Sequence, residues 1–419
     1  MEEQMEVADI LIKYNKFDMA LEVLEEIKEE HKKELEVYYK ISYIYEKKGL
    51  YDESLRVLKE IQNLYSDNGE IYFKIANIYE KKDELTSCFE NLSLAIKYGY
   101  ESEKVFFYKG LIYEKSYKTE EAVEEYNKSL KKNIIYMPSK YRLYAIYMKL
   151  NKFQDAEKIL NNMLKYNSDN YDGYNLKFSF FIALGKKEDG LEILKKAETV
   201  FNNYEPLKLD FIRYYLIVKN FNKAEEIIDN VGEESPYYID FMTKKAQILS
   251  LKGEREKAIE LLKSKEVYDE ENKTLLYLLA ILDSQCGKYK EAMCEIDKLT
   301  MDKDYSNEYV KIGMILKGYC MKNINSAELV EEYFRGIYKI LKIQSLSNPY
   351  DINTLLLRSI ILIELREFEK SEKILDGLEK VDGKKYGPYV KNIKEMMNLK
   401  RENKEVNSYE IFDRNGYFG

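Results

Sequence analysis

A short motif recurs nine times along the chain at a constant spacing of 34 residues. Each copy is anchored on a small residue, and the nine anchors are Ala20, Ser54, Cys88, Ala122, Ala156, Gly190, Ala224, Ala258 and Ala292. Five positions before the anchor, most copies carry a residue that favours the end of a helix: Asn15, Gly49, Asp83, Asn151, Gly185, Gly253 and Gly287. A fixed period of this length is typical of a solenoid, in which stacked units cover one another's apolar faces.

Each repeat predicts two amphipathic helices joined by a tight turn. When the first repeat is set at residues 1–34, the anchor is its twentieth position. In residues 35–68 apolar side chains recur at helical spacing along both helices: Val37, Tyr38, Ile41, Ile44 and Tyr45, then Leu55, Leu58, Ile61 and Leu64. Gly49 separates the two helices, because glycine tolerates the left-handed conformation that closes a helix. A large side chain at the anchor would force the crossing helices apart.

This pattern resembles the tetratricopeptide repeat (TPR) family, whose 34-residue unit has small residues at positions eight and twenty and an aromatic at position eleven. Position eight here reads Ala8, Ser42, Ala76, Gly110, Ala246 and Ala280, but Tyr144, Phe178 and Ile212 depart from the pattern. Position eleven reads Tyr45, Tyr79, Tyr113, Tyr147, Phe181 and Tyr215. The family's tryptophan at position four is replaced by Tyr38, Tyr72, Phe106 or Tyr174. The resemblance implies an all-α, right-handed α-solenoid of about eleven units.

The period is expected to hold over residues 1–340, as ten repeats, and then to shift. The next match runs from Arg366 to Ser371, and its anchor Ser371 lies 45 residues after Ser326, eleven residues later than the period requires. Eleven residues are about three helical turns, so we expect a longer helix from about Ser326 to Leu346. Residues 341–351 would then contain the extra turns and a linker, followed by an eleventh unit at 352–385.

The C-terminal end is expected to carry a capping helix over residues 386–403, because a solenoid needs a terminal element with one polar face. This helix would start at Gly387-Pro388 and bury Val390, Ile393, Met396, Met397 and Leu399. A polar tail, 404–419, follows. Its aromatic residues Phe412, Tyr417 and Phe418 would either fray with the chain end or dock on a groove.

Composition restricts the classes of partner. The 67 basic and 75 acidic residues give a net charge of −8 with both signs mixed throughout, which argues against nucleic acid as a partner. The apolar stretches are far too short for a membrane span, and the acidic N-terminus does not look like a signal peptide. Four scattered cysteines fit reduced thiols, so we expect a cytoplasmic protein.

The sequence offers little for catalysis. His31 is the single histidine and sits in a charged run, so a solvated surface imidazole is expected rather than a general base. Cys286 and Cys294 are close in sequence, but two thiolates make a poor metal site, and we interpret them as buried small residues. Phosphate-binding and nucleophile-elbow motifs do not occur. We therefore expect no enzymatic activity, no metal and no cofactor.

The resemblance places partner binding in a concave groove lined by the first helices of the repeats. In the second to fifth repeats the exposed groove positions include Tyr39, Lys40, Tyr43, Phe73, Lys74, Asn77, Phe107, Tyr108, Tyr141 and Arg142. The pairs Glu46-Lys47, Glu80-Lys81 and Glu114-Lys115 add charge at one end of these helices. Aromatic rings supply contact area and polar groups fix register, so this set suits a peptide or a helix of a protein partner. The alternative is that the rings pack between adjacent helices.

The leading hypothesis is a non-enzymatic scaffold for protein–protein interaction. The alternatives are a regulator that senses a short peptide and an accessory subunit of an enzyme such as a glycosyltransferase. In the family, a carboxylate clamp of lysine, asparagine and arginine holds acidic C-termini. Asn77 and Arg142 are isolated here, so that clamp is not expected.

Overall fold

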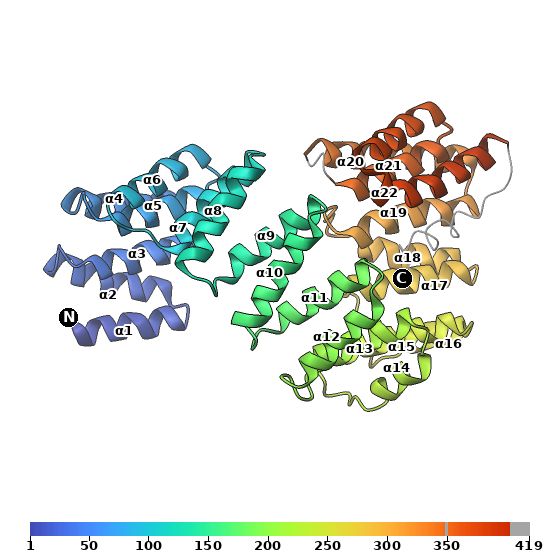
Figure 1. Ribbon diagram of the computed structural model, residues 1–419, viewed down its shortest axis with the longest axis horizontal. Coiled ribbons are helices and arrows are strands. Elements are labelled where there is room, and N and C mark those ends of the chain that lie inside the picture. The colour runs from blue at the N-terminus through green and yellow to red at the C-terminus, as the bar shows by residue number, and fades with distance from the viewer. Residues whose placement is uncertain (348–350, 403–419) are drawn as a thin grey trace. The chain divides into compact units, whose positions relative to one another are not determined.

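A computed structural model describes residues 1–347 and 351–402, in which every regular element is an α-helix. The helices form two compact lobes, an N-terminal lobe (Met1–Asn202) and a C-terminal lobe (Asn203–Gly419). Within each lobe the helices alternate between the first and the second helix of a repeat, here called the A and B helices (Figure 1). The predicted all-α solenoid of helix pairs is thereby confirmed.

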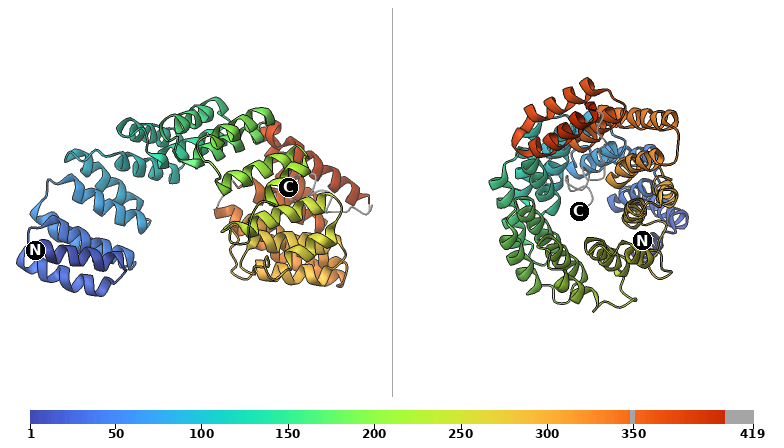
Figure 2. Two further views of the ribbon diagram at one scale, coloured as in Figure 1. Left: turned by 90° about the horizontal axis from the view of Figure 1, so that it is seen from below. Right: turned by 90° about the vertical axis from the view of Figure 1, so that its right-hand side faces the viewer.

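The N-terminal lobe contains six helix pairs. Its A helices are α1 (Glu2–Lys13), α3 (Leu35–Lys47), α5 (Gly69–Lys81), α7 (Glu103–Lys115), α9 (Met137–Lys149) and α11 (Tyr171–Ala183). Its B helices are α2 (Phe17–Glu30), α4 (Tyr51–Leu64), α6 (Leu85–Lys97), α8 (Thr119–Lys132), α10 (Phe153–Tyr166) and α12 (Lys187–Glu198). Each B helix up to α10 packs against its own A helix and against the A helix of the next repeat (Figure 2).

The described part of the C-terminal lobe follows the same order. Its A helices are α13 (Glu205–Ile217), α15 (Tyr238–Leu251), α17 (Lys273–Gln285), α19 (Glu308–Lys322) and α21 (Ile352–Glu364). Its B helices are α14 (Phe221–Ile228), α16 (Arg255–Leu262), α18 (Tyr289–Leu299), α20 (Ala327–Ser347) and α22 (Phe368–Arg401). The long helix expected from about Ser326 to Leu346 corresponds to α20.

The anchors are buried in all nine repeats, from Ala20 to Ala292. In the second repeat the anchor Ser54 lies directly against the eighth-position residue: the hydroxyl oxygens of Ser42 and Ser54 are 2.8 Å apart. Small side chains are required at the anchor because the A and B helices cross there at close range, immediately after the turn.

The turn between the A and B helices uses one conformation throughout. The fifteenth position of each of the first nine repeats has a positive φ, namely at Asn15, Gly49, Asp83, Tyr117, Asn151, Gly185, Lys219, Gly253 and Gly287. The sequence pattern identified seven of these, because Asn, Asp and Gly favour left-handed φ. Tyr117 and Lys219 were missed, since the packing of the helix pair imposes the conformation on residues that do not favour it.

At the C-terminal end, the segments expected as two separate helices are joined in α22. Helix α22 is continuous from Phe368 to Arg401 with Pro388 inside it, yet the Arg401 guanidinium lies 5.5 Å from the centre of the Phe368 ring. A straight helix would separate these residues by about 50 Å. The helix therefore reverses between an outgoing arm (368–380) and a returning arm (386–401), and Lys394 pairs with Asp376 at 2.8 Å across the reversal.

The returning arm takes the place of the expected capping helix. Val390, Ile393, Met396 and Met397 are buried with Leu375 of the outgoing arm in one apolar cluster, whereas Leu399 is exposed. Burial of this apolar stripe explains why the chain folds back. Residue 403 and the tail with Phe412, Tyr417 and Phe418 lie outside the described residues. None of the described helices is long and apolar enough to cross a bilayer.

Candidate partner-binding surface

The ten residues expected to line the groove all lie on the A helices α3, α5, α7 and α9 of the N-terminal lobe. We call this set the A-helix face. It comprises Tyr39, Lys40, Tyr43, Phe73, Lys74, Asn77, Phe107, Tyr108, Tyr141 and Arg142. The structure brings most of them into contact with a neighbouring A helix, so their side chains are held in fixed positions.

Tyr39 and Lys74 join α3 to α5. The Lys74 ammonium lies 4.1 Å from the centre of the Tyr39 ring, which is a close cation–π contact, and Glu70 is 3.7 Å from the same ammonium. Burial, with the nearby Glu70 carboxylate, raises the pKa of Tyr39 well above its usual range. The Tyr39 hydroxyl is buried and finds no hydrogen-bond partner within the described part of the chain.

Phe73 does not lie on the surface, contrary to the expectation. Only 8% of it is exposed, and its ring centre lies 5.2 Å from that of Tyr100 and 6.0 Å from that of Tyr108. An aromatic ring at this position fills the gap between consecutive repeats, because burying it removes a large apolar area from water. Phe73 therefore supports the surface from beneath and cannot contact a partner itself.

Phe107 and Tyr108 continue the row of rings onto α7. Phe107 is half-buried, with its ring centre 5.8 Å from Tyr126 and 5.6 Å from Tyr136. Tyr108 is also half-buried, and burial raises its pKa to about 12. Both rings keep part of their surface in solvent while their neighbours restrict their rotation.

The remaining members differ in how accessible they are. Tyr43 is 41% exposed, and the Tyr141 hydroxyl donates to Asp172 of the next A helix at 2.5 Å. Lys40 is paired with Asp9 of the preceding repeat. The buried Asn77 amide oxygen, like the Tyr39 hydroxyl, has no hydrogen-bond partner in the residues described.

Charged pairs at the ends of the A helices connect one repeat to the next. Glu46 pairs with Lys81 at 2.5 Å, and Glu80 pairs with Lys115 at 3.7 Å, so a glutamate of each repeat meets a lysine of the following one. At the next junction Arg142 Nε donates to Glu114 at 3.0 Å. The sequence showed these charges but not their pairing. Because the charges neutralise one another, the A-helix face offers a partner mainly aromatic and amide groups.

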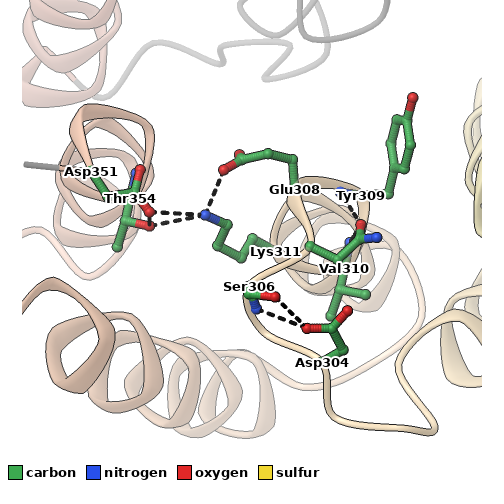
Figure 3. Close-up of polar contacts among 9 residues, drawn as sticks. Asp304, Ser306, Glu308, Tyr309, Val310, Lys311, Asp351 and Thr354 are labelled. Carbon is green, nitrogen blue, oxygen red and sulfur yellow. Dashed lines mark hydrogen bonds and ion pairs between the residues drawn. The ribbon is translucent and has the colours of Figure 1, made fainter. Parts of the chain in front are cut away.

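In the C-terminal lobe, the fifth position of the tenth repeat, which corresponds to Tyr39 and Phe73, is a lysine that is bound within the lobe itself (Figure 3). Lys311 of α19 is 1% exposed, and its ammonium contacts Glu308 at 2.6 Å, Asp351 at 3.1 Å and the Thr354 hydroxyl at 3.1 Å. Asp351 also caps α21 by accepting from the Thr354 backbone N–H at 3.1 Å. This network joins α19 to the start of α21, so the Lys311 charge is satisfied internally and is not available to a partner.

The residues considered for chemistry lie apart from one another. His31 is exposed at the end of α2, and its imidazole is 4.0 Å from Glu30. All four cysteines are free thiols. Cys88 and Cys320 are buried, but Cys294 is exposed and Cys286 half-buried, so the expected burial of the latter pair was wrong. Cys286 follows α17 at the turn and Cys294 lies on α18, and neighbouring side chains cover neither of them completely. The described residues contain no cluster of side chains able to hold a metal ion.

These features define the chain as an α-solenoid repeat protein with an aromatic A-helix face in its N-terminal lobe. Residues 35–68, the second repeat, match the sequence profile of the tetratricopeptide repeat. The match, the constant period and the helix pairs agree in phase. The chain therefore contains a tetratricopeptide repeat at residues 35–68, set in a row of helix pairs with the same 34-residue period.

A comparison with curated proteins finds no significant match. Among solved structures, a tetratricopeptide repeat protein from Parabacteroides merdae ATCC 43184 is similar at 17% identity with a TM-score of 0.46, over 60% of this chain and 98% of that one. PilW, a type IV pilus biogenesis factor, is similar at 15% identity with a TM-score of 0.41, over 50% and 97%. YrrB, a TPR protein with an unusual peptide-binding site, is similar at 15% identity with a TM-score of 0.33, over 44% and 95%.

Proposed function

We propose that this protein is a non-enzymatic scaffold that binds a peptide or helix of a partner protein on its A-helix face. The observation that carries the proposal is the set of partly exposed rings on the A helices α3, α7 and α9, represented by Tyr43, Tyr108 and Tyr141. Aromatic side chains dominate the energetics of protein interfaces, because they bury a large area with few rotatable bonds.

The contacts between repeats support this proposal energetically. Tyr108 is held by Phe73, and Tyr141 is held by its hydrogen bond to Asp172. A ring that is already fixed loses little conformational entropy when a partner covers it, so more of the contact energy remains as affinity.

The charge arrangement favours a particular kind of partner. The pairs Glu46–Lys81 and Glu80–Lys115 neutralise the charges that flank the rings. A partner segment rich in apolar and amide side chains fits this surface better than an acidic C-terminus, which would need unpaired cations. The peptide-sensing regulator remains an alternative that would use the same face.

The test is affinity capture from the native cell with quantitative mass spectrometry, using wild type and a Tyr43→Ala/Tyr141→Ala variant. The control is Tyr166→Ala, which removes a ring of similar exposure, 42%, from the B helix α10. Circular dichroism establishes that both variants fold. A partner retained by the control and lost from the double variant supports the A-helix face. A partner retained equally by all three proteins contradicts it.

A further inference from the structure

The first helix of the chain presents an apolar stripe that no described residue covers. Val7, Ile10 and Tyr14 are 47%, 56% and 68% exposed. With Glu3 they recur at helical spacing, so all four lie along one side of α1. Three exposed apolar residues in a row exceed the scattered single residues of an ordinary surface.

The stripe uses the positions with which every other repeat packs against its neighbour. The tenth position is buried in all the other repeats: Ile44, Ile78, Ile112, Ile146, Phe180, Tyr214, Ile248, Leu282, Leu316 and Ile361. Only in the first repeat, at Ile10, is it exposed. The side of α1 that carries Ile10 is therefore a stacking surface of the same kind as the junctions inside the solenoid, and a helix is its natural occupant.

The charges along α1 are arranged to match a second α1 in the opposite direction. Glu3 and Glu6 lie in the N-terminal half of the helix, and Lys13 and Lys16 lie at or just beyond its C-terminal end. All four are exposed and make no ion pair with the residues that the structure describes. Internal junctions, by contrast, pair their charges, as Glu46 does with Lys81.

We propose that two copies of this chain associate through α1, which packs antiparallel on α1 of the partner subunit about a two-fold axis. In this arrangement Val7 of each subunit meets Ile10 of the partner subunit, and Glu3 lies near Lys13 of the partner subunit. A two-fold interface must be complementary to itself, and the apolar centre with acidic and basic ends meets that requirement.

The returning arm of α22 presents a surface that differs from the stripe on α1. The returning arm of α22 buries Val390 and Ile393 beneath it and turns the polar residues Lys391, Glu395 and Asn398 outward. That polar outer side does not match an apolar stripe, so head-to-tail stacking into a filament is disfavoured. Pairing through α1 leaves the A-helix face of α3 to α9 unused and is independent of the function proposed above.

The first test is the molar mass of the purified chain at tens of micromolar, by light scattering coupled to size exclusion. Wild type is expected at twice the 49.9 kDa of one chain, and Ile10→Arg at 49.9 kDa. The control is Ile343→Arg, a 66% exposed position on α20, which should remain dimeric. A monomeric wild type, or an Ile10→Arg variant that stays dimeric with unchanged circular dichroism, overturns the proposal.

A charge exchange tests the antiparallel register separately. Glu3→Lys and Lys13→Glu each place like charges opposite one another and should weaken the homodimer at low salt. An equimolar mixture of the two variants restores both attractive contacts, so heterodimers should form. If mixing produces no more dimer than either variant alone, the register is wrong.

Discussion

Gly190 and Phe178 fit each other at the helix crossing of the sixth repeat: a Cβ added to Gly190 would lie 3.3 Å from Cδ2 of the Phe178 ring. Phe178 occupies position eight, where the family has a small residue, and Gly190 is the anchor at position twenty. The bulky residue is accommodated because its partner has no side chain. In the second repeat both positions hold serine, and their hydroxyl oxygens lie 2.8 Å apart. The two positions therefore share one limited volume.

Because the volume at a helix crossing is limited, Gly110→Ala should destabilise the N-terminal lobe. A Cβ at Gly110 would lie 2.6 Å from Cε1 of Tyr126, a fully buried ring whose hydroxyl donates to Glu114 at 2.8 Å. The ring cannot yield without losing that bond, so the free energy of unfolding should fall by about 1–3 kcal/mol in urea titrations. Gly336→Ala is the control, because nothing lies within 4 Å of its added Cβ. It should be neutral or stabilising by up to about 1 kcal/mol.

Lys219→Gly is expected to stabilise the C-terminal lobe. Lys219 is exposed and has a φ of 57°, a conformation that costs an L-residue about 1 kcal/mol more than glycine. The substitution should raise the urea midpoint. The reverse change at the equivalent turn, Gly253→Lys at a φ of 86°, should lower it by a similar amount. A Lys219→Gly variant less stable than wild type would show that the lysine side chain contributes more than its backbone costs.

Lys140 should make the stability of the N-terminal lobe depend on pH in the alkaline range. Its side chain is fully buried, its ammonium donates to Asn167 at 2.5 Å, and burial lowers its pKa from 10.5 to about 8. Below pH 8 Lys140 is charged in both the folded and the unfolded chain, so the free-energy cost of burying its ammonium is greatest there. Between pH 8 and 10.5 the folded chain releases its proton first, and stability rises.

Lys140→Met removes this titration. The variant should therefore be more stable than wild type at pH 7, by at most about 3 kcal/mol in the free energy of unfolding. This difference should shrink towards pH 10. Urea unfolding of both proteins at several pH values measures it. A difference that stays constant with pH would contradict the lowered pKa of Lys140.

Lys311→Met should destabilise the C-terminal lobe strongly. The change leaves Glu308 and Asp351 without their shared cation, and the loss of hydrogen bonds to a charged group costs about 1–3 kcal/mol. Thermal unfolding measures the loss. Lys311→Met/Asp351→Asn should recover part of it, because asparagine keeps the cap on Thr354 without a buried charge. A double variant no more stable than the single one would rule out the unpaired carboxylate as the cause.

The network also predicts sensitivity to acid. Burial alone would raise the pKa of Asp351, but hydrogen bonds from Thr354 and the Lys311 ammonium hold the pKa below 3.8. The carboxylate therefore contributes its full stability above about pH 4, and this contribution is lost as the pH falls through the lowered pKa. Asp351→Asn should flatten the wild-type decline in melting temperature over that range.

The sequence by itself determined the repeat, the positions of the helix pairs and the buried anchors, since these follow from local helical periodicity and from the size of one residue per repeat. It placed the ten residues of the A-helix face on the correct helices. It could not tell that Phe73 is buried while Tyr43 is exposed, because both are aromatic residues on outward-looking positions and only the neighbouring repeat decides which is covered.

Tertiary structure alone decided the remaining features, because each depends on residues that meet across repeats. The left-handed turns at Tyr117 and Lys219 are imposed by the packing of helix pairs against local preference. The reversal of α22 follows from burial of its apolar stripe on the outgoing arm. Only the structure shows that Ile10 is exposed, whereas the tenth position of every other repeat is buried. All these side chains are apolar, and the neighbouring elements of the fold decide which of them are covered.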